Sequence, residues 1–143
     1  MKKILMGLLL IVSIFTLTAC TSDKISKINY EKLMKKFDNQ ETFILLFNDE
    51  STDGKLLKNT LNDVLNEFNL EAYMINPTKL SQEEKNNLRS IIYVEVNGIA
   101  FINKGIDSSK LGHITSANAS KEDIKNNLIN HGFVDTNIEN TEN

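Results

Sequence analysis

The sequence predicts an α/β domain in which a central mixed sheet of four to five strands is flanked by helices, after an N-terminal signal segment. Short apolar runs alternate along the chain with longer segments in which apolar residues recur every three or four positions. The 143 residues suffice for one domain with a core, and 41% hydrophobic and 24% charged residues are ordinary for a globular protein.

The first nineteen residues have the pattern of a secretory signal. Lys2 and Lys3 form a positive start, and the apolar segment 4–17 follows. This segment is shorter than the roughly 20 apolar residues of a membrane span. It ends Leu17-Thr18-Ala19-Cys20, which resembles the lipobox of bacterial lipoproteins. The resemblance implies that residues 1–19 are removed and that Cys20 becomes a lipid-modified N-terminus.

Lipidation would use the only cysteine of the chain, so the mature protein would have no thiol for redox chemistry and no disulfide. Two acyl chains anchor a protein stably. Removal of 1–19 would change the formal charge from −3 to −5, because this segment holds two lysines and no acid. An acidic chain disfavours nucleic acid. We therefore expect a protein on the extracytoplasmic face of the cell membrane, without a nucleic-acid partner.

The first elements of the domain follow a polar tether, residues 20–29, in which 24–28 can form a short strand. Asn29 can cap a helix over 30–38, since its side chain accepts from free N–H groups of the first turn. The apolar residues of this helix recur on one face, at Tyr30, Leu33, Met34 and Phe37.

The centre of the domain is predicted at Phe43–Phe47, which is apolar on both faces, as expected for a strand covered by helices on each side. A helix should follow from Ser51 or Asp53 to Asn69, and a second core strand over 70–76. Ser81 and Glu84 have the spacing of a capping box, which predicts a helix over about 82–88.

Residues 91–96 allow two interpretations. Asn97-Gly98 is a strong hairpin signal, which would pair 92–96 with 99–102. Alternatively the strand begins at Gly98, and 99–102 pairs with 111–116 across a loop over 103–110.

The last helix is predicted over 121–131, capped by Ser120. Gly132 stands where a glycine often ends a helix, and Phe133 can pack back. The domain is thus expected to span 30–134. The polar, acidic residues 135–143 are expected to be disordered.

This order of elements resembles the thioredoxin fold, and within it the bacteriocin transport accessory proteins of Gram-positive bacteria. The similar stretches are Ile28-Asn29-Tyr30-Glu31-Lys32-Leu33, Glu41-Thr42-Phe43-Ile44-Leu45, Leu61-Asn62-Asp63-Val64-Leu65-Asn66-Glu67-Phe68 and Ala119-Ser120-Lys121-Glu122. The resemblance covers residues 25 to 134 and implies the fold and an extracytoplasmic setting.

The family carries a Cys-x-x-Cys pair followed by Lys at the start of the long helix. Placing that lysine on Lys55 puts the pair on Ser51 and Gly54, neither of which is cysteine. The family's cis-proline, which faces the pair, would fall on or next to Asn97, whereas the only proline is Pro77. The resemblance therefore does not imply thiol–disulfide activity.

Other chemistry has little support, and we expect no catalytic residue, no cofactor and no metal. A serine nucleophile at Ser51 would need a base, and neither His113 nor His131 has a sequence reason to meet it. The pattern Asp49-x-Ser51-x-Asp53-Gly54 resembles the first half of a calcium loop, but the twelfth position is Thr60 instead of Glu.

The sequence thus favours a lipid-anchored binding or accessory protein without redox activity, with peptide or bacteriocin export as its setting. The expected contact surface for an unidentified protein or peptide consists of two loops: Asp49, Glu50, Ser51, Thr52, Asp53 and Gly54 in the first, Asn97 and Gly98 in the second. The alternative is an immunity or surface-exclusion lipoprotein that binds an incoming toxin or phage component.

Overall fold

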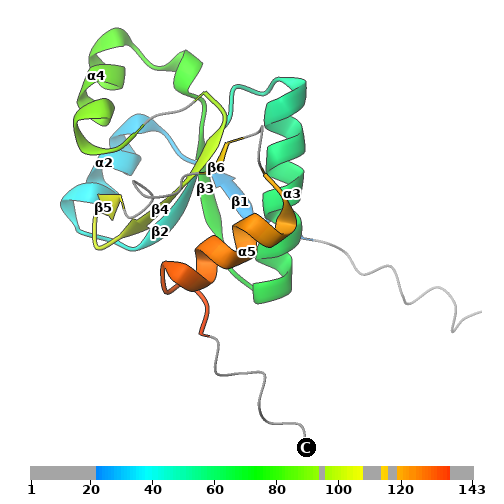
Figure 1. Ribbon diagram of the computed structural model, residues 1–143. Coiled ribbons are helices and arrows are strands. Elements are labelled where there is room, and N and C mark those ends of the chain that lie inside the picture. Colours follow the sequence, from blue (N-terminus) through cyan, green and yellow to red (C-terminus); the bar gives the residue numbers. More distant parts are fainter. Residues whose placement is uncertain (1–21, 94–95, 108–113, 116–118, 136–143) are drawn as a thin grey trace, which may run out of the picture.

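The computed structural model describes residues 22–93, 96–107, 114–115 and 119–135. Within these ranges a mixed sheet lies between two layers of helices (Figure 1). The sheet order is β1 (Ile25–Lys27), β3 (Ala72–Ile75), β2 (Phe43–Phe47), β4 (Gly98–Asn103) and β5 (Ile106–Asp107), and the two-residue β6 (Ile114–Thr115) also pairs with β4. β1, β3 and β2 are parallel, and β4 is antiparallel to its neighbours. The predicted fold class is confirmed.

The helices cover both faces of the sheet. They are α2 (Tyr30–Asp38), α3 (Thr52–Phe68), α4 (Gln82–Ile91), α5 (Lys121–Asn130) and the short 3-10 helix η1 (Pro77–Lys79). α3 and α5 lie on one face and α2 and α4 on the other (Figure 1).

All five residues of β2 are buried, as predicted for a central strand. Successive side chains of a strand point to opposite faces. Ile44 and Leu46 accordingly pack with α3 and α5, whereas Phe43, Leu45 and Phe47 pack with α2 and α4. A strand with two apolar faces is therefore what joins the two hydrophobic clusters of the domain.

Three helices begin after the predicted capping residues Asn29, Ser81 and Ser120, and α3, whose start was left open between Ser51 and Asp53, is capped by Ser51. The side chains of Asn29, Ser51, Ser81 and Ser120 each accept a hydrogen bond from the first turn of the helix that follows. At the end of α5, Gly132 has a φ of 75° and the Phe133 N–H donates to the Leu128 carbonyl at 2.8 Å. This is the glycine-terminated helix end expected from the sequence.

The two interpretations of residues 91–96 are now distinguished. Ile91 belongs to α4, and β4 begins at Gly98, which pairs with Phe47 and Thr115. The hairpin across Asn97-Gly98 is wrong, because both neighbours of β4 at this end come from distant parts of the chain. The expected loop over 103–110 is also wrong in part, because β5 lies within it.

The chain is fixed to the domain from Ser22 onward. The Lys24 N–H donates to Asn62 Oδ1 at 2.8 Å, and Asn66 Nδ2 donates to the Ser22 carbonyl at 2.9 Å. An ion pair of 3.0 Å joins Asp23 to Lys58. Residues 22–24, which directly precede β1, are thus held along α3.

The predicted signal segment 1–19, Cys20, His113 and most of the expected tail lie outside the described residues. Among the residues that are described, no helix has the length and apolar character to cross a membrane.

Candidate functional site

The structure brings the two predicted loops together at the N-terminus of α3. The Asp49 N–H donates to Asn97 Oδ1 at 3.1 Å, and Asn97 Nδ2 donates to Ser51 Oγ at 3.4 Å. Asn97 therefore holds both the loop and the capping residue of α3, although 46 positions separate it from Ser51. Whether these loops bind a partner stays a prediction.

A buried asparagine forms the inner part of the junction. Asn48 is 2% exposed, its Nδ2 donates to the Gly54 carbonyl at 3.0 Å, and its Oδ1 accepts from the Glu50 N–H at 2.7 Å. Sequence reasoning placed Asn48 in the loop but not among the site residues. The sequence does not show that Asn48 is buried, because its burial depends on the position of α3.

Gly54 occupies a position where a side chain has no space. A Cβ at this residue would lie 2.3 Å from Asn48 Oδ1, 2.6 Å from Asn97 Oδ1 and 3.0 Å from Asp49 Oδ1. The first of these distances is far below any normal contact between carbon and oxygen. The glycine therefore allows three side-chain oxygens to converge on the first turn of α3.

The remaining predicted residues are divided between surface and core. Thr52 and Asp53 are exposed in the first turn of α3, where the positive end of the helix dipole favours an acidic side chain. Gly98 is buried at the start of β4. The exposed part of the junction therefore comes from Asp49–Asp53 and Asn97.

Among the described residues, the Ser51 side chain has the contacts of a helix cap. The Ser51 hydroxyl accepts hydrogen bonds from the Gly54 N–H, at 3.2 Å, and from Asn97. The His131 ring is stacked on Phe101, with centroids 5.4 Å apart, at the end of α5. The described ranges also hold no group of three or more His, Cys, Asp and Glu side chains that could bind a metal ion.

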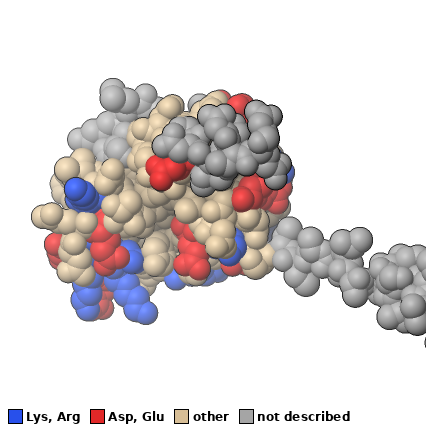
Figure 2. Space-filling model, turned by 90° about the horizontal axis from the view of Figure 1, so that it is seen from below, with Lys and Arg blue, Asp and Glu red and all other residues tan. Residues whose placement is uncertain are grey.

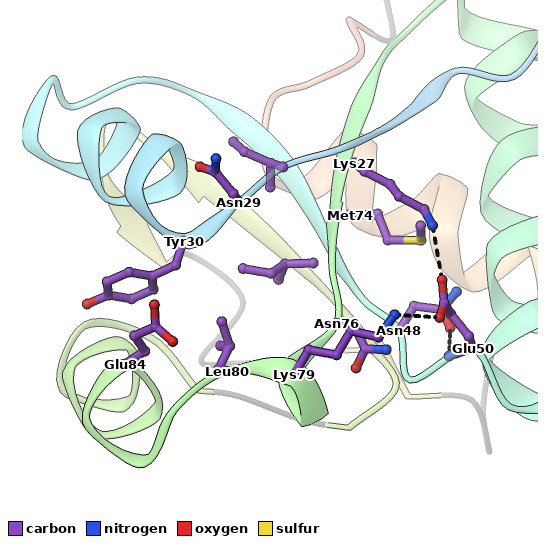
Figure 3. Close-up of a pocket in the computed structure, with 12 residues that line it drawn as sticks. Lys27, Asn29, Tyr30, Asn48, Glu50, Met74, Asn76, Lys79, Leu80 and Glu84 are labelled. Atoms are coloured by element: carbon purple, nitrogen blue, oxygen red, sulfur yellow. Dashed lines mark hydrogen bonds and ion pairs between the residues drawn. The ribbon is translucent and has the colours of Figure 1, made fainter.

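A hollow that the sequence did not predict lies beside the junction. Its volume is about 300 Å³, and it opens at the carboxyl ends of β1 and β3, between these strands, α2 and α4 (Figure 3). Asn48 and Glu50 border both the hollow and the junction. The parallel pairing of β1 and β3 could have indicated the position of this hollow, because ligands of open α/β sheets bind at the carboxyl ends of the strands.

Two carboxyl groups of the junction are stabilised in the charged form. Hydrogen bonds from Ser51 hold the pKa of Asp49 below its ordinary value. The ammonium groups of Lys27 and Lys79, each 3.1 Å from a Glu50 carboxylate oxygen, lower the pKa of Glu50.

These shifts predict a pH dependence of stability. A carboxyl group whose pKa is lowered by folding stabilises the folded state above its unfolded pKa, here near 3.8 for Asp49 and 4.5 for Glu50. That contribution is lost as the pH falls through the lower folded pKa values. We expect the melting temperature of the wild type to fall more steeply between about pH 5 and pH 3 than that of the Asp49→Asn/Glu50→Gln variant. Equal slopes in thermal melts, with Glu71→Gln as control, would contradict the assignment.

The class of fold is now clear: this chain has the thioredoxin fold. A solved structure described as "A putative oxidoreductase with a thioredoxin fold" is similar, with a TM-score of 0.58 and 7% sequence identity over 72% of this chain and 92% of that chain. At this identity the likeness shows the fold alone. No protein-family model and no curated protein matches the chain.

Proposed function

We propose that this chain is a lipid-anchored extracytoplasmic binding protein that uses the thioredoxin fold without thiol–disulfide exchange, in peptide or bacteriocin export. One observation carries the proposal. Ser51 and Gly54 stand where the family would hold its two thiols, and the three oxygens around Gly54 leave no room for a side chain there. The junction therefore suits a chain without a pair of cysteines at positions 51 and 54.

Apolar side chains beside the junction support a role in binding. Leu56 follows Ser51 by little more than one helical turn and is 64% exposed, while Val96 precedes Asn97 and is 52% exposed. The hydrogen bond between Asn97 and Ser51 brings these two segments together. Exposed apolar side chains around polar loops are suited to an extended peptide, whose backbone needs hydrogen bonds and whose side chains need apolar contacts.

The docking of residues 22–24 supports a lipid anchor that leaves the junction accessible. Ser22 is bound to Asn66, fifteen residues along α3 from Ser51, or about 22 Å at 1.5 Å per residue. Cys20 is two residues from Ser22, which can span at most about 7 Å. A lipid on Cys20 would therefore hold the far end of α3 near the membrane and the junction away from it.

The face shown in Figure 2 is consistent with attachment by lipid. Among the described residues of this face, lysine side chains gather at the lower left of the view and lie next to acidic ones. A bilayer with anionic headgroups attracts clusters of lysine and arginine, so this face offers little electrostatic attraction of its own.

The proposal is tested in cells that lack the gene and are supplied with variants of the full chain. Wild-type protein should incorporate labelled palmitate and restore export of the peptide or bacteriocin that the cells secrete. Cys20→Ala should not incorporate the label, and the protein should appear in the medium. Leu56→Ser/Val96→Ser should keep the label but fail to restore export. Ile106→Ser, at an exposed apolar residue of β5, serves as the matched control.

Two outcomes would contradict the proposal. Palmitate on Cys20→Ala would refute the anchor, and reduction of insulin by the wild type would refute the lack of redox activity. Toxin or phage sensitivity of the deletion strain, without an export defect, would instead favour the immunity or surface-exclusion protein.

A further inference from the structure

The hollow beside the junction has an apolar interior. Its inner surface includes Ile28, Ile75 and Leu80, of which Ile28 is 9% and Ile75 5% exposed. Figure 3 shows Leu80 inside the hollow, with Lys27, Glu50 and Lys79 at one side and Tyr30 and Glu84 at the other. An apolar concave site with a few polar groups at its edge is the usual form of a small-ligand site.

One side of the hollow has more positive than negative charge. The ammonium groups of Lys27 and Lys79 share the single carboxylate of Glu50, at 3.1 Å each. The other acidic lining residue is Glu84, whose carboxylate accepts from the Ser81 N–H at 2.8 Å and so caps α4. At the side of the hollow formed by Lys27, Glu50 and Lys79, two ammonium groups therefore share one carboxylate. Figure 3 shows Glu84 on the opposite side of the hollow, so the side with the lysines favours an anionic ligand.

Glu50 has an unfavourable backbone conformation, and its carboxylate is held by these ion pairs. Its φ is +66°, a value that residues other than glycine adopt rarely and at a cost. Its side chain is 41% exposed, so little packing opposes its movement. The carboxylate of Glu50 can therefore leave the two lysines when another carboxylate replaces it.

We propose that the hollow binds a small apolar carboxylate, whose apolar part contacts Ile28, Ile75 and Leu80 and whose carboxylate binds Lys27 and Lys79. In the empty site Glu50 takes the place of the ligand's carboxylate. The free C-terminus of a peptide ending in an apolar residue and a short aliphatic acid share this chemistry. The inference does not depend on the proposed function, because Leu56, Val96 and the anchor have no part in it.

The test is a titration of the ¹⁵N-labelled full chain with three probes: Ala-Ala-Leu with a free C-terminus, the same peptide amidated, and hexanoate. A free carboxylate should shift the amide signals of Ile28, Asn48 and Leu80, and the amidated peptide should not. Binding of the free-acid peptide alone would identify a peptide C-terminus as the ligand. Binding of hexanoate as well would identify the aliphatic carboxylate itself.

Variants test the roles of the charges. Glu50→Gln should tighten binding of the free-acid probe by about threefold to tenfold, and Lys27→Ala or Lys79→Ala should weaken it by a similar factor. Lys55→Ala, at an exposed lysine outside the hollow, should leave the affinity unchanged. Equal binding of free and amidated peptide, no binding of either acid to wild type and Glu50→Gln, or unchanged affinity in both lysine variants would overturn the proposal. So would shifts centred on Asn97, which would place the probe at the junction.

Discussion

Gly54→Ala is expected to lower the free energy of unfolding by about 2–3 kcal/mol. The added methyl group would overlap Asn48 Oδ1 at 2.3 Å and Asn97 Oδ1 at 2.6 Å, both of which are held by other hydrogen bonds. Alanine has the better helix propensity, so the loss would be steric. Urea unfolding measures it, with Lys55→Ala on the same turn as control. A change below about 0.5 kcal/mol would show that the oxygens move aside freely.

The same crowding bears on the proposal that this chain has no thiol–disulfide exchange. A cysteine at position 51 would replace a capping serine, which is a local change. A cysteine at position 54 would place its Cβ among the oxygens of Asn48, Asp49 and Asn97. A thiol pair at positions 51 and 54 is therefore expected to need further changes at Asn48, Asp49 or Asn97.

The elements that local sequence determines were predicted well. β2 and α2 have the predicted bounds. Each is defined within about ten residues, β2 by an apolar run between turns and α2 by one apolar face and an asparagine cap. The N-termini of α2, α4 and α5 were found for the same reason, since a capping side chain bonds to the turn that follows it, whereas the start of α3 was left open between Ser51 and Asp53.

The features that the sequence did not predict depend on contacts between distant segments. The start of β4 was ambiguous because Asn97-Gly98 is locally a hairpin signal, whereas the strand pairs with Phe47 and Ile114–Thr115. The hollow needs the ends of β1 and β3 and the start of α4 together, and none of these segments carries a motif. Of the junction, the sequence predicted its position but not the hydrogen bonds of Asn97 or the enclosure of Gly54.

Asn48→Ala is the second substitution with a large expected effect, about 2 kcal/mol of unfolding free energy. The variant leaves the buried end of the loop without the amide that joins the Gly54 carbonyl to the Glu50 N–H. Burial raises the cost, because water does not readily replace a side chain that is 2% exposed. Urea unfolding measures the loss, and the exposed Asn103→Ala should stay within about 0.5 kcal/mol of the wild type.

The double variant Asn48→Ala/Gly54→Ala distinguishes the two causes of instability. Removing Asn48 also removes the oxygen closest to the Cβ of residue 54, at 2.3 Å. The double variant should therefore be less destabilised than the sum of the single variants, by about 1 kcal/mol. Strict additivity would mean that Asn97 and Asp49, and not Asn48, exclude a side chain from position 54. In that case the loop before β4 would be the part of the junction that fixes the glycine.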